Sequence, residues 1–162
     1  MSLMNVVLGV VALGAALLLA GCAGLLTGSA PPDLGLHSGL LKAPSKTRNS
    51  VTSQADRFPE AKHRDYASIA PLAFSGEPDA AMARLAAVVQ RMAGAVLVTR
   101  QPNYLYATFT TRWLRFVDDV EFALDAPTGV IHVRSASRLG AEDFGTNRRR
   151  IEAVRSAFDA AR

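Results

Sequence analysis

The stretch from Ala95 to Ser137 has a period of two, with apolar side chains at alternate positions along most of its length. No other feature of the chain limits the possible folds as much, because this alternation is typical of β-strands that face a core on one side. Turn residues such as Pro102 and Gly129 divide the stretch. We therefore expect four strands, at residues 95–100, 104–113, 116–125 and 130–137. Their connections are short, so neighbouring strands should be antiparallel.

Two amphipathic helices are predicted on either side of these strands, over residues 78–93 and 147–161. Apolar residues recur in them at helical spacing: Met82, Leu85, Val89 and Met92 in the first, and Ile151, Val154, Phe158 and Ala161 in the second. Pro78 suits a first helical turn, and Thr146 or Asn147 can cap the second helix. This order predicts an α+β fold, with two helices packed on one face of a four-stranded antiparallel sheet.

The region before the first of these helices gives weaker signals. Residues 44–55 are polar and turn-rich and residues 56–68 are charged and irregular, so loops are predicted for both. Residues 69–74 are apolar, but Pro71 restricts them to an edge strand or an extended lead-in. We place a single folded domain at residues 44–162.

Charged side chains are concentrated in residues 116–155 of this domain. Alternation places Asp119 and Glu121 on one face of the third predicted strand, and Asp118 on the more apolar face that meets the helices. A buried Asp118 requires a charged or hydrogen-bonding partner. A tight hairpin before the fourth strand would set Glu121 opposite Arg134, a favourable cross-strand pair.

Three arginines, Arg148, Arg149 and Arg150, open the last helix, where positive charge opposes the helix dipole. Steps of 100° place Arg148 on one flank of the apolar stripe together with Glu152 and Arg155, and Arg150 on the other flank. This charge requires compensation. The candidate partners are the carboxylates of Asp118, Glu142 and Asp143, or an anionic ligand.

Three interpretations of this charged region remain open. The candidate residues for an anion-binding or structural network are Asp118, Asp119, Glu121, Arg134, Ser135, Ser137, Arg138, Asn147, Arg148, Arg150, Glu152 and Arg155. An arginine–carboxylate network that docks the last helix is the simplest interpretation. The same arginines and hydroxyls, with the helix N-terminus, could bind a phosphate or carboxylate. The alternative is a hydrolase that uses Asp118 or Asp119 as a base or metal ligand.

Little in the sequence favours catalysis. His63 and His132 have no Ser or Cys partner at motif spacing, and the chain contains no Gly-rich phosphate loop and no Cys/His metal pattern. We assign no catalytic residue and expect no metal and no cofactor. The net charge of +4 comes from interleaved basic and acidic residues, which disfavours nucleic acid as a partner and suits an anionic membrane surface.

The N-terminus carries an apolar run at residues 6–20, followed by Gly21 and Cys22. A short apolar run that ends in small residues predicts a secretory signal, here residues 1–21, with residues 22–43 as a Gly/Ser/Pro-rich tether. The segment Leu19-Ala20-Gly21-Cys22 resembles the lipobox of bacterial lipoproteins. The resemblance implies cleavage before Cys22 and acylation of its sulfur, so that membrane lipid becomes a partner through Cys22.

An uncleaved membrane anchor is the alternative, because residues 6–26 nearly suffice to span a bilayer and residues 1–5 contain no Lys or Arg. Both interpretations place the domain in the cell envelope, on a membrane and facing the periplasm or the cell exterior. Cys22 is the single cysteine, so no internal disulfide is expected.

Several motifs resemble one family, the domain of unknown function 1499. They are FVDDVEF at residues 116–122, VRSASRLG at 133–140, NRRRIEAVR at 147–155, YLYA at 104–107, IAPL at 69–72 and NSVTS at 49–53. Members often have Cys where this chain has Ser50, a departure that argues against a required thiol at that position. The resemblance covers about residues 44–156 and implies a bacterial envelope protein without an established activity. We expect a membrane-anchored lipoprotein that serves as a binding or structural module for an anionic ligand or envelope partner.

Overall fold

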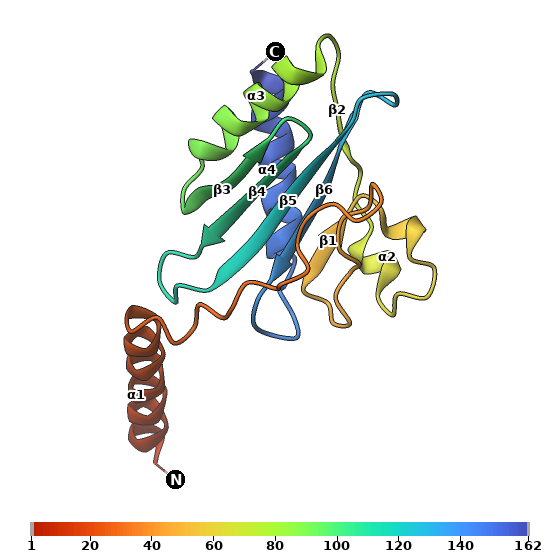
Figure 1. Ribbon diagram of the computed structural model, residues 1–162. Helices are drawn as coiled ribbons and strands as arrows, with labels where there is room; N and C mark the ends of the chain where they lie inside the picture. The colour runs from red at the N-terminus through yellow and green to blue at the C-terminus, as the bar shows by residue number, and fades with distance from the viewer. Residues whose placement is uncertain (1, 162) are drawn as a thin grey trace.

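A six-stranded antiparallel sheet forms the centre of the computed structural model, which describes residues 2–161 (Figure 1). The strands are β1 (Ser50–Thr52), β2 (Leu72–Ala73), β3 (Ala95–Gln101), β4 (Tyr104–Thr110), β5 (Val117–Asp125) and β6 (Val130–Ser137). Their order is β1-β6-β5-β4-β3, and β2 also pairs with β6. The four predicted strands are confirmed as an antiparallel meander from β3 to β6.

The prediction of only four strands is wrong, because two short strands join the outer edge of β6. Ser50–Thr52, within the region predicted as a loop, pairs with residues 134–136 and is fully buried. Its three residues are polar or β-branched and show no alternation of apolar and polar side chains. They form a strand because they pair with the free edge of β6. β2 pairs with Ile131 and Val130 directly after Pro71, as predicted for an edge strand.

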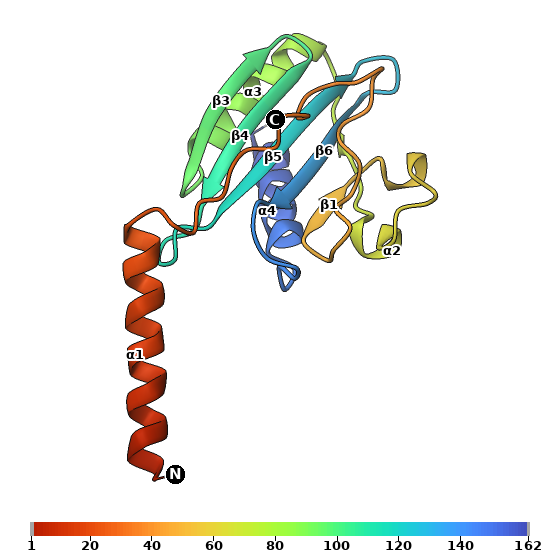
Figure 2. The same ribbon diagram turned by 60° about the horizontal axis from the view of Figure 1, so that its bottom comes forward.

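Two helices, α3 (Pro78–Gln90) and α4 (Thr146–Ala160), cover one face of the sheet, as predicted (Figures 1 and 2). Their apolar faces meet the sheet in one core, which includes Leu85 and Val89 of α3, Phe158 of α4 and Phe122 of β5. The protein also contains two short helices outside the predicted set, the 3₁₀ helix η1 (Ala55–Arg57) and α2 (Arg64–Ala67).

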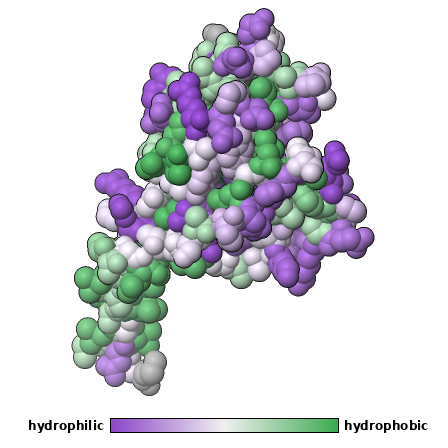
Figure 3. All heavy atoms as spheres, in the orientation of Figure 1, coloured by the Kyte–Doolittle hydropathy of each residue, from purple (hydrophilic) through white to green (hydrophobic). Residues whose placement is uncertain are grey.

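The N-terminal helix α1 (Leu3–Cys22) projects away from the domain, and hydrophobic atoms cover most of its surface (Figures 1 and 3). It is the one helix within residues 2–161 that is long and apolar enough to cross a membrane, with a mean hydropathy of 2.5. A signal sequence has the same properties, so α1 is compatible with a signal peptide or a membrane anchor.

Residues 33–42, which we call the strap, run across the sheet face opposite α3 and α4 (Figure 2). The Gly35 N–H donates to Glu121 Oε1 at 2.8 Å, and the Leu41 N–H donates to Gln54 Oε1 at 2.8 Å. Leu41 is buried against Tyr104 and other apolar side chains of the sheet. The second half of the expected tether, residues 22–43, therefore lies against the domain.

Candidate functional site

Strand β5 directs carboxylates to both faces of the sheet, and arginines meet them on each face. In the register of β5 with β6, Glu121 lies opposite Arg134 and Asp118 lies opposite Ser137. Because side chains alternate along a strand, Asp118 faces the helices while Asp119 and Glu121 face the strap. This is the distribution that the sequence predicts.

On the helix side, Asp118 forms a buried ion pair with Arg150 of α4. The Arg150 guanidinium also donates to Asn147 Oδ1 at 2.8 Å and to Ser135 Oγ at 3.2 Å. Its carbon lies 5.1 Å from the centre of the Phe109 ring, within the range of a cation–π contact. Arg150 therefore ties α4 to three neighbouring strands, β4, β5 and β6.

Asn147 is fully buried and connects α4 to the outer strands. Its side-chain nitrogen donates to the carbonyl oxygen of Asn49 at 3.0 Å, to Ser137 Oγ at 3.0 Å and to Asp143 Oδ2 at 2.8 Å. Ser135 Oγ donates to its side-chain oxygen at 2.5 Å. Each hydrogen-bonding atom of the amide is used, so Asn147 acts as a structural connector.

The start of α4 differs from the prediction, because neither Thr146 nor Asn147 is the cap. Gly145 holds the cap position with a φ of 77°, and both predicted residues lie inside the helix. The carboxylate of Asp143 accepts hydrogen bonds from the N–H groups of Gly145 at 3.0 Å and Asn147 at 2.9 Å. The chain therefore fills the anion-binding position at this helix N-terminus with its own carboxylate.

Burial alone would raise the pKa of the Asp143 carboxyl, but hydrogen bonds from the Tyr66 hydroxyl and from the amides of Asn147 and Gly145 hold it below its ordinary value. Burial and the neighbouring Asp143 raise the pKa of Tyr66 in turn. Both shifts favour the charged carboxylate and the neutral phenol, the pair that stabilises the start of α4.

The remaining arginines of α4 donate hydrogen bonds to backbone carbonyls. Arg148 donates to the carbonyl oxygens of Tyr66 at 2.6 Å and Ser68 at 2.8 Å. Arg155 donates to the carbonyl oxygens of Pro71 at 2.5 Å and Ala70 at 2.7 Å. Arg148 and Arg155 thereby hold the segment between α2 and β2 in place.

Three side chains around this group have local partners. Arg155 also pairs with Glu152 at 2.9 Å. Arg149 is exposed and donates to the carbonyl oxygen of Phe144 at 2.9 Å. Glu142, one of the predicted partners of the helix arginines, pairs instead with Arg48 at 3.2 Å.

On the strap side, Glu121 is fully buried and has three donors. They are the Arg134 guanidinium at 3.3 Å, the Tyr104 hydroxyl at 2.8 Å and the N–H of Gly35 in the strap at 2.8 Å. Burial lowers the pKa of Arg134 against the opposing effect of Glu121, and Arg134 Nε has no hydrogen-bond partner among residues 2–161. Burial, together with the charge of Glu121, raises the pKa of Tyr104.

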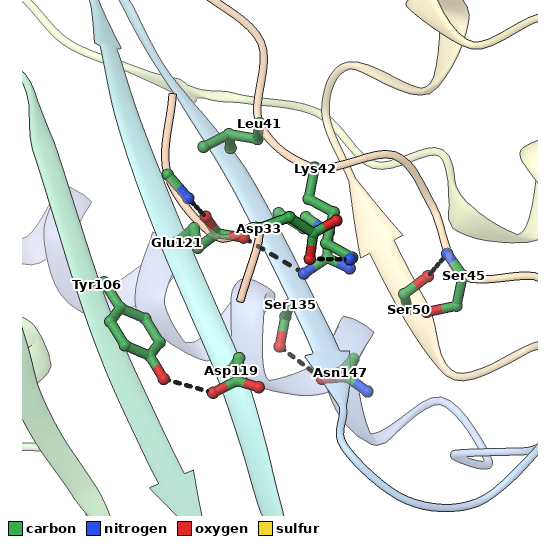
Figure 4. Close-up of polar contacts among 12 residues, drawn as sticks. Asp33, Leu41, Lys42, Ser45, Ser50, Tyr106, Asp119, Glu121, Ser135 and Asn147 are labelled. Carbon is green, nitrogen blue, oxygen red and sulfur yellow. Dashed lines mark hydrogen bonds and ion pairs between the residues drawn. The ribbon is translucent and has the colours of Figure 1, made fainter. Parts of the chain in front are cut away.

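Next to this group, Asp119 pairs with Arg138 through two parallel bonds, from Nε to Oδ2 at 3.0 Å and from Nη2 to Oδ1 at 2.8 Å. The Tyr106 hydroxyl donates to the same carboxylate at 2.6 Å (Figure 4). Burial, and then the hydrogen bond to Asp119, raises the pKa of Tyr106 to about 12. A paired geometry of this kind is rigid and favours ionised partners.

The three strand carboxylates, Asp118, Asp119 and Glu121, are thus all paired with arginines, and none is free to accept a proton from a substrate. No group of three or more His, Cys, Asp or Glu side chains within residues 2–161 could hold a metal ion. Ser50 is buried as well, and its hydroxyl accepts a hydrogen bond from the Ser45 N–H at 2.8 Å (Figure 4). Ser50 therefore has a local structural role.

One serine–histidine contact was not predicted. Ser53 Oγ lies 3.1 Å from His132 Nδ1, and His132 Nε2 lies 3.6 Å from an oxygen of Asp125. The second distance is too long for a hydrogen bond, and Ser53 Oγ already accepts from the Val133 N–H at 2.9 Å. The order of residue types is that of a catalytic triad, but the histidine is not held by its carboxylate.

An open recess with basic walls lies where the strap ends. It has a volume of about 730 Å³ and is lined by residues 43–46 and 57–62, with Phe58 among its apolar side chains. A neighbouring cavity of about 600 Å³ extends it along the strap. Lys46, Arg57 and Lys62 lie on its walls, and within residues 2–161 none of the three has a carboxylate at ion-pair distance. We call this feature the strap recess.

The structure brings most of the predicted site residues into two arginine–carboxylate groups, one on each face of β5 and β6. Residues that the sequence did not indicate include Asp33, Lys42, Tyr104, Tyr106, Lys46, Arg57 and Lys62. For the tyrosines, the available signals were their shared face on the second predicted strand and their place in the YLYA motif at residues 104–107. The recess residues lie in segments predicted as loops. Loops have no periodic pattern, so the contacts between these segments could not be predicted from the sequence.

The sequence profile of a family described as proteins of unknown function, DUF1499, matches residues 41–158. The match covers the sheet, α3 and nearly all of α4, and it begins at the end of the strap. No curated protein and no solved structure matches the chain.

Proposed function

Since the chain belongs to the DUF1499 family of proteins of unknown function, we propose its role from its geometry: a membrane-anchored binding module of the cell envelope that recognises an anionic ligand. The observation that carries this proposal is that paired and unpaired cations lie in different parts of the molecule. The arginines that meet the β5 carboxylates are paired within the fold, while the strap recess presents unpaired cations beside apolar walls.

The anchor is the segment that ends at Cys22. In α1, none of the most apolar window is buried against the domain, which is expected of a helix that lies in a membrane or is removed from the mature chain. The Leu19-Ala20-Gly21-Cys22 sequence favours cleavage and acylation of Cys22 over an uncleaved helix. Several acyl chains would then hold the domain stably on the bilayer.

The ligand chemistry follows from the walls of the strap recess. Its volume of about 730 Å³ lies in the range of small-molecule sites. Three cations, Lys46, Arg57 and Lys62, outnumber the single carboxylate on the walls, Glu60. Phe58 and the neighbouring prolines and alanines provide apolar contact. A ligand with one anionic group and a short apolar part, or a partner segment of that character, suits these walls.

A hydrolase is a weaker proposal. The candidate bases Asp118 and Asp119 are held by Arg150 and Arg138, and proton abstraction requires an acceptor within reach of the substrate. The α4 N-terminus is also disfavoured as the ligand site, because Asp143 occupies its amides.

The ligand is tested by thermal unfolding of the full chain in phosphatidylcholine nanodiscs, with hexyl phosphate as the probe and hexanol as its uncharged counterpart. A ligand that binds only the folded state raises Tm in a saturable manner. We expect the rise with hexyl phosphate, no rise with hexanol, and loss of the effect in Lys46→Gln/Lys62→Gln.

The matched control is Arg100→Gln, an exposed arginine at the end of β3, outside the recess. It should keep the full response to hexyl phosphate. An equal response in the double lysine variant, or no response in the wild type, would exclude the recess as an anion site.

A further inference from the structure

Three exposed large apolar side chains of the domain lie in two loops. Excluding α1, Leu25 and the edge strand β3, the exposed residues of this kind are Trp113, Leu139 and Phe144. Trp113 is 67% exposed in the β4–β5 loop, and Phe144 is 82% exposed in the β6–α4 loop. Aromatic side chains are largely buried on average, and exposed apolar side chains that gather on one surface mark an interaction site.

Both loops lie at one end of the sheet. Thr110, at the end of β4, pairs with Val117, at the start of β5, and the last residue of β6 pairs with Asp118. The β4–β5 loop (residues 111–116) and the β6–α4 loop (residues 138–145) therefore extend in the same direction. Figures 1 and 2 show both at the end of the domain from which α1 projects.

The end of α1 contacts the β4–β5 loop directly. A Cβ atom at Gly21 would lie 2.7 Å from the carbonyl oxygen of Leu114, so the backbones approach so closely that only glycine fits. This contact places Cys22 beside the loop. Cleavage before Cys22 would remove the Gly21 contact, but Gly28 still approaches Arg138 and Leu139 of the β6–α4 loop and keeps the chain after Cys22 at this end of the domain.

Positive charge accompanies the exposed aromatic groups. Arg112 stacks over the Trp113 ring at 4.9 Å, and neither Arg112 nor Arg115 has a carboxylate at ion-pair distance within residues 2–161. Arg112 and Arg115 also border a cavity of about 670 Å³ that Phe109 helps to line. In the second loop, Arg138, Glu142 and Asp143 are already paired or hydrogen-bonded.

We propose that the β4–β5 and β6–α4 loops form a docking surface for an anionic phospholipid bilayer, with Trp113, Leu139 and Phe144 in the interface and Arg112 and Arg115 against lipid phosphates. Tryptophan is enriched at membrane interfaces, and basic residues near an anionic leaflet are attracted to it. The proposal rests on the membrane anchor of the proposed function. It adds a second contact, which fixes the orientation of the domain on the membrane.

Trp113 is the single tryptophan of the chain and therefore reports on this surface without labelling. The full chain is reconstituted into vesicles of phosphatidylcholine alone or mixed with phosphatidylglycerol, and flotation measures association. Quenching of Trp113 by brominated lipid and by aqueous iodide then measures its position. We expect a blue-shifted emission, strong quenching by brominated lipid and weak quenching by iodide, all more pronounced with phosphatidylglycerol.

Arg112→Gln/Arg115→Gln should lose the part of the lipid quenching that depends on phosphatidylglycerol, while Arg100→Gln, an exposed arginine at the opposite end of β3, should retain it. A chain that floats with the vesicles but has red emission and full iodide quenching would overturn the docking surface and leave the anchor intact. A chain that does not float would overturn the anchor, and the docking surface with it.

Discussion

At Asp118 the chain buries a carboxylate beneath α4 and balances it with a single guanidinium, that of Arg150. A buried ion pair of this kind adds little to stability compared with an apolar pair of the same size, but the loss of one partner leaves an uncompensated buried charge. The pair therefore specifies where α4 docks more than it stabilises the fold.

Removal of Arg150 tests this role. We expect Arg150→Met to lower the free energy of unfolding by about 3 kcal/mol, because Asp118 would remain charged without its partner. Arg149→Met, on the exposed side of the same turn, should change it by less than about 0.5 kcal/mol. Urea unfolding measures both, and a loss in Arg150→Met no larger than that in Arg149→Met would contradict the account.

Asp143 makes stability depend on acid pH. Its folded-state pKa lies below the value in the unfolded chain, so its contribution is fully present above an unfolded pKa of about 3.9 and is lost as pH falls through the folded pKa. Asp143→Asn should destabilise the protein by about 1 kcal/mol at neutral pH, because the cap of α4 is weakened.

The difference between Asp143→Asn and wild type should shrink as pH falls below about 4, measured by urea unfolding across a pH series. Asp65→Asn, at an exposed carboxylate of α2, is the surface control for the same measurement. A difference that stays constant down to the acid limit would show that the Asp143 charge does not stabilise α4.

Sequence alternation was sufficient for the faces of Asp118, Asp119 and Glu121, and the assumption of a tight hairpin added the pair of Glu121 with Arg134. The pairing of Asp119 with Arg138 was not predictable, because Arg138 lies beyond the end of β6 and its direction depends on the loop that follows. The cap of α4 was assigned wrongly for a similar reason. The Asp143 carboxylate, two residues before Gly145, accepts the hydrogen bonds that the Thr146 hydroxyl or the Asn147 amide was expected to accept. Rules based on local sequence favour Thr146 or Asn147 as the cap.

At the scale of elements, strong periodicity predicted four strands and two helices, Pro71 restricted the apolar segment of β2 to an edge strand or an extended lead-in, and the absence of periodicity concealed β1. These short strands form because β6 offers an unpaired edge, a condition that exists only in the folded protein. The strap is a second case, since its Gly35 and Leu41 bind partners far along the chain. No local pattern distinguishes such a segment from a flexible tether.

The turn between α3 and β3 depends on Gly94 for two reasons. Its φ of 77° favours glycine, and an added Cβ would overlap with the carbonyl oxygen of Thr110. Gly94→Ala should therefore destabilise the protein by about 3 kcal/mol. Gly76→Ala has a similar φ of 83° and open space around it, so about 1 kcal/mol is expected there.

Thermal or urea unfolding of the two alanine variants separates backbone strain from steric overlap at this turn. Equal losses in Gly94→Ala and Gly76→Ala would mean that the turn can move away from β4 without penalty. A larger loss at Gly94 would confirm that the approach of the turn to β4 is close and rigid.

At the scale of the whole molecule, within residues 2–161, one set of charged side chains forms ion pairs inside the fold and a second set has no ion-pair partner. The first set joins α4, the sheet and the strap, and it accounts for the dense polar region near the C-terminus. The second set lies in the strap recess and in the β4–β5 loop. The sequence indicated a site in the first set, because density of charge is visible in a linear chain, whereas most of the pairing depends on the folded structure.

The free charges have a function in this account only if the domain is held at a membrane through Cys22, which lies beside the β4–β5 loop. The most direct measurement is incorporation of labelled palmitate by the full chain in a bacterial host, with Cys22→Ala as the control. We predict a labelled, shortened wild-type chain and an unlabelled Cys22→Ala chain. Label that persists in Cys22→Ala, or a wild-type chain without label, would contradict anchoring by acylation at Cys22.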